Sequence, residues 1–267
     1  EIHLAPWEIK FNSKKIIQTI NSENRSVMRL FEYVFDKYAE VQGKKRWFCK
    51  DNNLFNYAWE INNFFDDPKF IYLVRDPRDV CLSNIKRSTG VNTAYYFSKL
   101  WKKEQEKCIR LFNEQEFKDK IILVKYEKIL SKPKESFKKI CDFINEPFQE
   151  KMLYGKKRKE AKSTDQWKNI SKNILKNNRK KYKSRLSKKQ IKIIETVLNK
   201  EMKYLDYDLD FSDNGYKIGF LQKGFYKIKD VLLRKYKFKF KTKKNEYKIR
   251  KKRRELRKNI NQRYLID

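Results

Sequence analysis

The segment from Lys69 to Arg87 constrains the fold of this chain more than any other stretch of its sequence. It begins with an apolar run, Phe70–Val74, whose length is typical of a buried strand. The run ends at Arg75, and Pro77, two residues later, cannot continue a central strand. We therefore predict a strand that ends beside Arg75 and is followed at once by a helix.

The predicted helix carries polar side chains that suit an anion. Asp79 is a candidate helix cap, and Ser83 and Arg87 lie on one face of the helix because they are four residues apart. Open α/β sheets bind ligands at the carboxyl edge of their strands. An arginine fork, a hydroxyl and a helix N-terminus together are typical of a phosphate site. The pattern predicts that Arg75, Ser83 and Arg87 bind a phosphate group.

Periodicity along the rest of the chain predicts alternating helices and strands. Apolar positions at helical spacing predict helices over residues 26–41, 54–65 and 97–112, and two more that begin at Pro133 and Ser187. The last of these opens with a capping box, Ser187 and Gln190. Short apolar runs predict strands over residues 46–50 and 121–126. Strands separated by helices indicate parallel β-α-β units, so we predict an α/β fold with a parallel sheet flanked by helices.

Cysteine and histidine usage argues against a metal site and against a serine–histidine–aspartate triad. The chain has one histidine, His3, and four cysteines that are far apart in the sequence. The cysteines lie in apolar contexts, which favours buried, reduced thiols at Cys49, Cys81, Cys108 and Cys141. With no visible signal peptide or membrane-spanning segment, we expect a cytoplasmic location.

Positive charge is concentrated at the C-terminal end. The formal net charge is +33, and residues 215–267 hold 20 lysines and arginines against 4 acidic residues. We therefore divide the chain into a domain over residues 1–212 and a basic, helical extension over residues 213–267. The extension is either a solvated basic helix or an arm that touches an anionic membrane surface, a polysaccharide or nucleic acid. The charge also has a third explanation, compositional drift in a chain rich in lysine, asparagine and isoleucine.

With the spacing of Arg75, Ser83 and Arg87 established, the chain resembles the sulfotransferases that use 3′-phosphoadenylyl sulfate (PAPS). The nearest branch contains bacterial and tyrosylprotein sulfotransferases. Further matches follow in order as far as about residue 210, namely Lys50-Asp51-Asn52, Lys125-Tyr126-Glu127, Ser163-Thr164-Asp165-Gln166, Lys181-Tyr182 and Tyr204-Leu205-Asp206-Tyr207. Asn52 stands where the family has proline, and Asp206 where it has glycine. The resemblance implies a sheet like that of P-loop nucleoside triphosphatases.

Binding and catalytic roles follow from the resemblance. It implies that Arg75, Ser83 and Arg87 bind the 3′-phosphate of PAPS, and that Tyr126 and Lys181 lie near the nucleotide. Each of these side chains also has an ordinary structural explanation, such as an ion pair of Arg75 with a neighbouring aspartate or packing of Tyr126. Arg78, by contrast, is expected to make structural ion pairs.

The resemblance also implies three catalytic residues. Lys50 would contact the bridging oxygen and stabilise the transferring sulfonate, with the hydroxyl of Ser163 beside it. Glu1 aligns with the acidic base that takes the proton of the acceptor. These groups would stabilise charge that develops in the transition state, without a metal.

One expected part of the family pattern is missing. None of the six glycines lies in a loop like the one that wraps the donor's 5′-phosphosulfate. Because Glu1 aligns just after that loop, we expect the first β-α unit to be absent and the sequence to be a fragment. The alternative is that the protein has lost the loop.

The sequence brings three functions into consideration. The favoured one is transfer of a sulfonate from PAPS to a hydroxyl of a peptide tyrosine, a carbohydrate or a lipid head group, and the positive charge favours an acidic peptide or polysaccharide. The second is a non-catalytic protein that binds polyanions or a membrane surface on a degenerate sulfotransferase scaffold. The third, a nucleotide kinase, requires a Walker loop that the sequence lacks. We do not expect nucleic acid as a partner.

Overall fold

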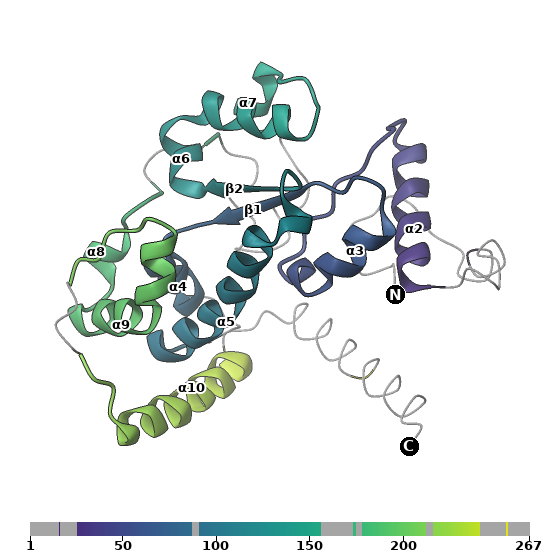
Figure 1. Ribbon diagram of the computed structural model, residues 1–267. Helices are drawn as coiled ribbons and strands as arrows, with labels where there is room; N and C mark the ends of the chain where they lie inside the picture. Colours follow the sequence, from purple (N-terminus) through teal and green to yellow (C-terminus); the bar gives the residue numbers. More distant parts are fainter. Residues whose placement is uncertain are drawn as a thin grey trace. The chain divides into compact units, whose positions relative to one another are not determined.

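The structure, a computed structural model, describes residues 16, 26–86, 91–155, 173–174, 178–211, 216–240 and 255. These residues form an α/β structure in which a two-stranded sheet is flanked by helices, which confirms the predicted fold class (Figure 1). The chain divides into two compact units. Unit 1 comprises residues 1–70 and 110–121, and unit 2 comprises residues 71–109 and 122–267.

The helices and strands keep the labels of Figure 1. In chain order they are α2 (Val27–Val41), η3 (Leu54–Tyr57), α3 (Ala58–Phe64), β1 (Phe70–Val74), α4 (Pro77–Lys86), α5 (Ala94–Asn113), η4 (Gln115–Phe117), β2 (Ile121–Lys125), α6 (Tyr126–Ser131), α7 (Pro133–Phe143), η5 (Glu150–Leu153), α8 (Tyr182–Arg185), α9 (Lys188–Tyr204) and α10 (Phe220–Phe240).

Strands β1 and β2 are neighbours in the sheet and run in parallel. At one end, the backbone N–H of Phe70 donates to the carbonyl of Lys120 at 2.7 Å. At the other end, the backbone N–H of Asp76 donates to the carboxylate of Glu127 at 3.0 Å. The partner lies 50 residues later in the first pair and 51 in the second, and such a constant offset defines parallel strands. Helices α4 and α5 connect them, as the predicted β-α-β unit requires.

The core of unit 2 lies where α4 meets α8 and α9. Its fully buried side chains include Cys81, Ile194, Leu198 and Met202. The predicted capping box opens α9, because the N–H of Ser187 donates to Gln190 at 2.9 Å and the N–H of Gln190 donates back to the Ser187 hydroxyl at 3.2 Å.

All four cysteines are free, and burial makes Cys81 the least reactive of those in the core. Burial raises the pKa of the Cys81 thiol to about 12. Since the thiolate is the reactive form, we expect Cys81 of the folded protein to resist alkylation at about pH 8 and to react once urea unfolds the chain. Mass spectrometry after a pulse of iodoacetamide measures this. Cys49, which is only partly buried, is the internal control, and equal labelling of Cys49 and Cys81 in the folded protein would contradict the prediction.

Unit 1 has an aromatic cluster where a strand was predicted. Residues 46–50 form no strand, so that prediction is wrong. The ring of Trp47 instead packs on α2, 4.9 Å from the ring of Phe35 and 5.6 Å from that of Phe31. Its Nε1 donates to Asp36 at 2.8 Å. Side-chain packing therefore holds this segment without a backbone ladder.

The predicted helical extension is confirmed over α10, which packs against the rest of unit 2. The carboxylate of Asp230 is buried and accepts the backbone N–H groups of Asn92 at 2.6 Å and Thr93 at 3.2 Å. Tyr226 packs against the core, where its ring lies 5.7 Å from that of Tyr95. The boundary at residue 212 stays a prediction. Among the described residues, no helix has the length and hydrophobicity that crossing a membrane requires.

Candidate functional site

The turn from β1 into α4 is built by two aspartates with different roles. Asp76 caps the helix, because its Oδ1 accepts the backbone N–H of Arg78 at 2.9 Å and its carbonyl accepts the first helical hydrogen bond, from Val80. Asp79, the predicted cap, lies in the first turn instead. Its Oδ1 accepts the N–H of Tyr182 at 3.0 Å and so ties α4 to α8. The prediction of Asp79 as the cap is therefore wrong.

Arg75 lies at the end of β1, as predicted, with part of its hydrogen-bonding capacity unused. One Nη donates to the carbonyl of Asn178 at 3.0 Å. The same nitrogen lies 3.7 Å from Asp79, which is an ion pair but too long for a hydrogen bond. Its Nε is buried and has no hydrogen-bond partner among the described residues. Arg75 therefore pairs with Asp79 only weakly, and this pairing leaves the Nε–H donor of Arg75 unused.

Tyr126 is brought to Arg75 from the end of the neighbouring strand. The guanidinium lies over the Tyr126 ring, 4.7 Å from its centroid. The hydroxyl of Tyr126 accepts a hydrogen bond from Asn178 at 2.8 Å. Arg75 and Tyr126, which the sequence placed at the ends of two different strands, therefore share one site. Asn178 hydrogen-bonds to both of them.

Positive charge gathers where α4 ends and α8 begins. Ser83 is exposed on α4, three residues before Lys86, and Lys181 is exposed at the start of α8. Partial burial, together with repulsion by Arg185 and Lys181, lowers the pKa of Lys86. This repulsion indicates that the three cations face a common region, which favours an anion there. Lys181 therefore lies in a basic cluster with Lys86 and Arg185.

Lys50 belongs to unit 1 and is exposed. Its Nζ donates to the side chain of Asn52 at 2.9 Å, and Asp51 accepts the backbone N–H of Asn53 at 2.7 Å. Asn52 replaces the proline of the family pattern, and its amide holds the lysine. Three predicted site residues, Glu1, Arg87 and Ser163, lie outside the described residues.

Comparison with known proteins decides the family. The model of the family described as "Sulfotransferase family" matches residues 8–150, which is more than half of the chain. The chain belongs to the sulfotransferase family. The matched region includes the β1–α4 turn, Lys50 and Tyr126. Three of the predicted site residues, Glu1, Ser163 and Lys181, lie outside it.

Two relatives are putative protein-tyrosine sulfotransferases. The one from Caenorhabditis briggsae is 32% identical over 97 residues, which are 35% of this chain and 35% of the relative. The one from Caenorhabditis elegans is 32% identical over 96 residues, which are 35% of this chain and 37% of the relative. The matched part therefore spans about a third of these relatives. Among solved structures, the sulfotransferase domain from the curacin biosynthetic pathway matches with a TM-score of 0.49 and 17% identity, over 74% of each chain.

Unit 2 also contains a buried ionic network, of which the sequence predicted only the role of Arg78. Arg78 makes structural ion pairs, as predicted, with Asp76 at 2.8 Å and Glu195 at 2.6 Å. Glu195 also accepts the backbone N–H groups of Asp210 and Phe211 at 3.0 and 2.9 Å. Burial alone lowers the pKa of Arg78, but the hydrogen bonds and charges of Asp76 and Glu195 outweigh it and raise the pKa. The network holds the amino end of α4 against α9.

Glu127 and Asn178 support the site and were not assigned roles from the sequence. One oxygen of Glu127 accepts the N–H of Asp76, and the other accepts the hydroxyl of Tyr207 at 3.1 Å. Glu127 thus fixes the residue that follows Arg75. Glu127 directly follows Tyr126 in the Lys125-Tyr126-Glu127 motif, so the sequence resemblance could have identified it as a residue of the site. Asn178 contributes its carbonyl and amide from a loop, and no periodicity marks such a residue.

Proposed function

We propose that this sulfotransferase moves a sulfonate group from PAPS to a hydroxyl group of its acceptor. The observation that carries the proposal is the meeting of Arg75 and Tyr126 at the ends of two parallel strands, beside the start of α4. Within the described part of the chain the Nε of this guanidinium is buried and has no partner, and an arginine with an unused donor suits a phosphate oxygen. Family membership does not favour the alternative of a non-catalytic polyanion-binding protein.

The residues of unit 2 fit the 3′-phosphate half of the donor. Arg75 would bind the phosphate through its fork, and Ser83 would donate its hydroxyl from α4. Lys181 would contribute long-range attraction from the basic cluster with Lys86 and Arg185. Arg87 follows α4 directly in the sequence and would add a second fork. Tyr126 would present its ring face to the nucleotide.

Lys50, Ser163 and Glu1 are proposed for the chemical step. The acceptor oxygen would form a bond to sulfur as the bond from sulfur to the bridging oxygen breaks. Lys50 and Ser163 would stabilise the negative charge on that bridging oxygen, and Glu1 would take the acceptor's proton. No metal is required in this scheme.

For the acceptor, we propose a tyrosine hydroxyl of a protein. The support is that the two relatives are named as putative protein-tyrosine sulfotransferases. The net charge of +33 would attract an acidic peptide over a neutral one. Carbohydrate and lipid head groups are the other hydroxyl carriers to compare in an acceptor assay. A cytoplasmic location stays a prediction.

Nucleotide binding tests the donor. We expect 3′-phosphoadenosine 5′-phosphate to bind more tightly than adenosine 5′-phosphate, because only the former has the 3′-phosphate that Arg75 would contact. Arg75→Ala should weaken its binding by about 2–4 kcal/mol, or roughly 30- to 1,000-fold, and leave the weaker nucleotide unaffected. Isothermal titration calorimetry on protein expressed from the whole coding sequence measures both affinities.

Two variants control this measurement. Arg75→Lys keeps the charge but loses the fork, so we expect an intermediate affinity. Arg110→Ala removes an exposed arginine of unit 1 and should bind like the unaltered protein. Thermal unfolding shows whether each variant is folded. Equal affinity for the two nucleotides in the unaltered protein would refute PAPS as the donor.

A further inference from the structure

Helix α10 presents a continuous apolar stripe to solvent. Its members are spaced by four, three, four and four residues, which places them on one face of the helix. Their exposed fractions lie between 53% and 85%. We call this face the outer stripe, and it consists of Leu221, Phe225, Ile228, Leu232 and Tyr236. Soluble proteins rarely leave so many large apolar side chains in a row uncovered.

The opposite face of α10 holds the helix on unit 2. Asp230 is only 3% exposed and accepts the N–H groups of Asn92 and Thr93. Tyr226 packs on the core one turn earlier, and Lys237 donates to the carbonyl of Ile85 nearly two turns later. Because these contacts lie across the helix from the outer stripe, they fix it in an outward orientation.

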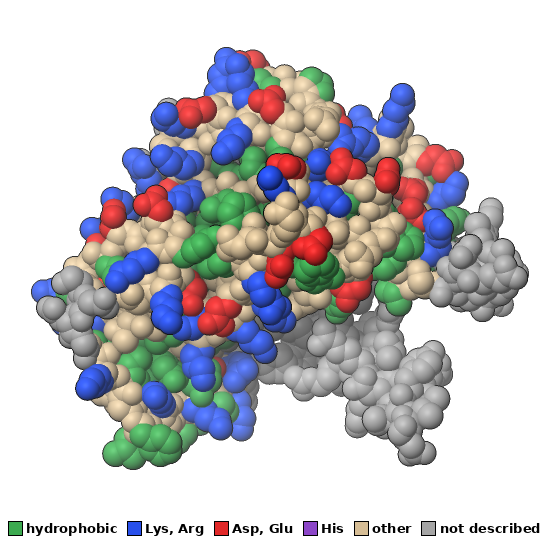
Figure 2. All heavy atoms as spheres, viewed as in Figure 1, with side chains coloured by type: hydrophobic (Ala, Val, Ile, Leu, Met, Phe, Trp, Pro, Cys, Tyr) green, Lys and Arg blue, Asp and Glu red, His purple; other side chains and the backbone are tan. Residues whose placement is uncertain are grey.

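Cations flank the outer stripe on both sides. Lys229 lies on one flank with its ammonium 5.8 Å from the ring of Phe225, and Lys235 lies on the other, and both are exposed. Arg234 instead faces the docked side of the helix, where it pairs with Asp230 at 3.4 Å. Residues 220–240 contain seven lysines and arginines, and their one acidic side chain, Asp230, is buried. Figure 2 shows hydrophobic side chains with lysines and arginines beside them at its lower left, where Figure 1 places α10.

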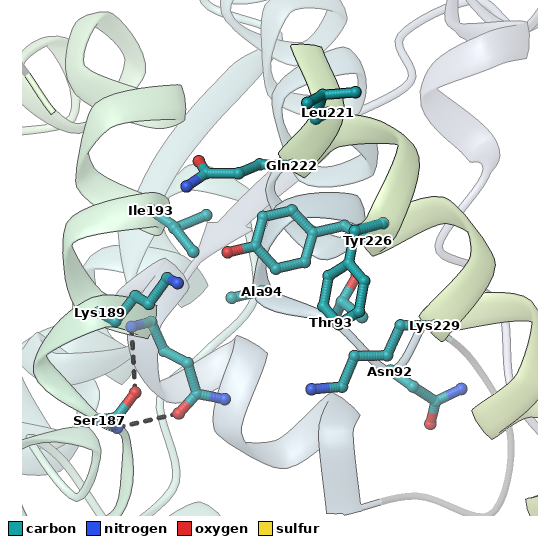
Figure 3. A pocket seen from close by; sticks show the side chains of 12 residues that line it. Asn92, Thr93, Ala94, Ser187, Lys189, Ile193, Leu221, Gln222, Tyr226 and Lys229 are labelled. Atoms are coloured by element: carbon teal, nitrogen blue, oxygen red, sulfur yellow. Dashed lines mark hydrogen bonds between the residues drawn. The ribbon is translucent and has the colours of Figure 1, made fainter. Parts of the chain in front are cut away.

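An open groove adjoins the amino-terminal half of the outer stripe. It has a volume of about 480 Å³ and lies between α10, the start of α9 and residues 92–94. The ammonium groups of Lys189 and Lys229 point into it (Figure 3). Leu221 and Phe225 of the outer stripe also line it. Apolar and cationic side chains thus lie together at one opening. An anionic lipid needs both kinds of contact, because its acyl chains are apolar and its head group is negatively charged.

We propose that α10 binds the surface of a lipid bilayer that contains anionic lipids. The outer stripe would lie at the boundary of head groups and acyl chains, and the flanking cations would contact lipid phosphates and carboxylates. A second copy of the chain is a poorer occupant, because two such helices would bring their positive charges together. Nucleic acid would use the cations but leave the outer stripe exposed to water. This surface is separate from the proposed donor site and does not depend on it.

Vesicle sedimentation tests the proposal on the full chain. Vesicles of phosphatidylcholine with about 30% phosphatidylserine, at about 0.1 M salt, should bind the protein at least about tenfold more tightly than phosphatidylcholine alone. Two stripe substitutions, Phe225→Asp with Leu232→Asp, should reduce that binding about tenfold or more. The charge pair Lys229→Glu with Lys235→Glu should reduce it similarly. Equal, weak binding to both kinds of vesicle would overturn the proposal.

Matched controls separate this surface from general basicity. Leu100→Asp alters an exposed leucine of α5, and Lys103→Glu with Lys139→Glu alters two exposed lysines of α5 and α7. We expect these variants to bind vesicles much more like the unaltered protein. If the stripe variant binds as well as the unaltered protein, or the lysine controls lose as much binding as Lys229→Glu with Lys235→Glu, the proposal fails. It also fails if the stripe variant changes only self-association, as analytical ultracentrifugation would show.

Discussion

Replacing Lys50 with alanine is expected to lower turnover about 100- to 1,000-fold while nucleotide affinity changes by less than about threefold. The reason is that a fixed cation at the bridging oxygen acts mainly when charge develops there, in the transition state. The structure shows Lys50 exposed and held by the side chain of Asn52 at 2.9 Å. Initial rates with saturating PAPS and a tyrosine peptide, on protein expressed from the whole coding sequence, measure the effect.

Neighbouring variants sharpen the Lys50 experiment. Lys45→Ala removes an exposed lysine of the same segment and should leave turnover unchanged. Asn52→Ala frees the Lys50 ammonium without removing it, so we expect a loss of less than about tenfold. A Lys50→Ala protein that turns over normally would exclude Lys50 from the chemical step. An equal loss in Lys45→Ala would attribute the effect to general charge.

Arg78→Met is expected to lower the free energy of unfolding by about 3–5 kcal/mol. Arg78 is buried and pairs with Asp76 and Glu195, whose side chains are also buried. Without the guanidinium, the partners that Glu195 keeps among the described residues are the backbone N–H groups of residues 210 and 211. Urea unfolding followed by circular dichroism measures the loss.

The double variant Arg78→Met with Glu195→Gln tests the cause of that loss. If an uncompensated buried charge destabilises the single variant, removing the Glu195 charge as well should recover part of the stability. Arg110→Met, at an exposed position, should change stability by less than about 0.5 kcal/mol. A double variant that is less stable than the two single changes predict together would contradict this explanation.

The elements that the sequence predicted best are those with strong local signals. The apolar run that became β1 and the helical periodicity of α2, α5 and α9 are confirmed as a strand and helices. The expected burial of β1 is confirmed only in part, because Val74 is buried but Leu73 is 55% exposed. The capping box at Ser187 and Gln190 depends on residues three apart, so it too was visible locally. Family motifs then identified Arg75 and Tyr126 before the structure brought them together.

The predictions that were wrong or incomplete concern residues whose contacts are distant in the sequence. Either aspartate near Pro77 suits a cap, and Pro77 at the first helical position favours Asp76. Asp79 is drawn instead to the backbone of Tyr182, about 100 residues away, which no local pattern shows. Glu195 was missed, although a glutamate on the apolar face of α9, between Ile191 and Leu198, signals a buried cationic partner. Residues 46–50 have the composition of a strand but pack through Trp47.

The docking of Asp230 has a consequence for biosynthesis. Its carboxylate accepts the backbone N–H groups of Asn92 and Thr93, which lie just ahead of α5. Asp230 therefore caps the amino end of a helix, although it is synthesised about 137 residues after Thr93. During translation, α5 therefore emerges before Asp230 is available to those N–H groups. The contact closes when α10 has left the ribosome, so this part of the chain is expected to reach its native state late in synthesis. A nascent chain that stalls before residue 230 should remain a chaperone substrate.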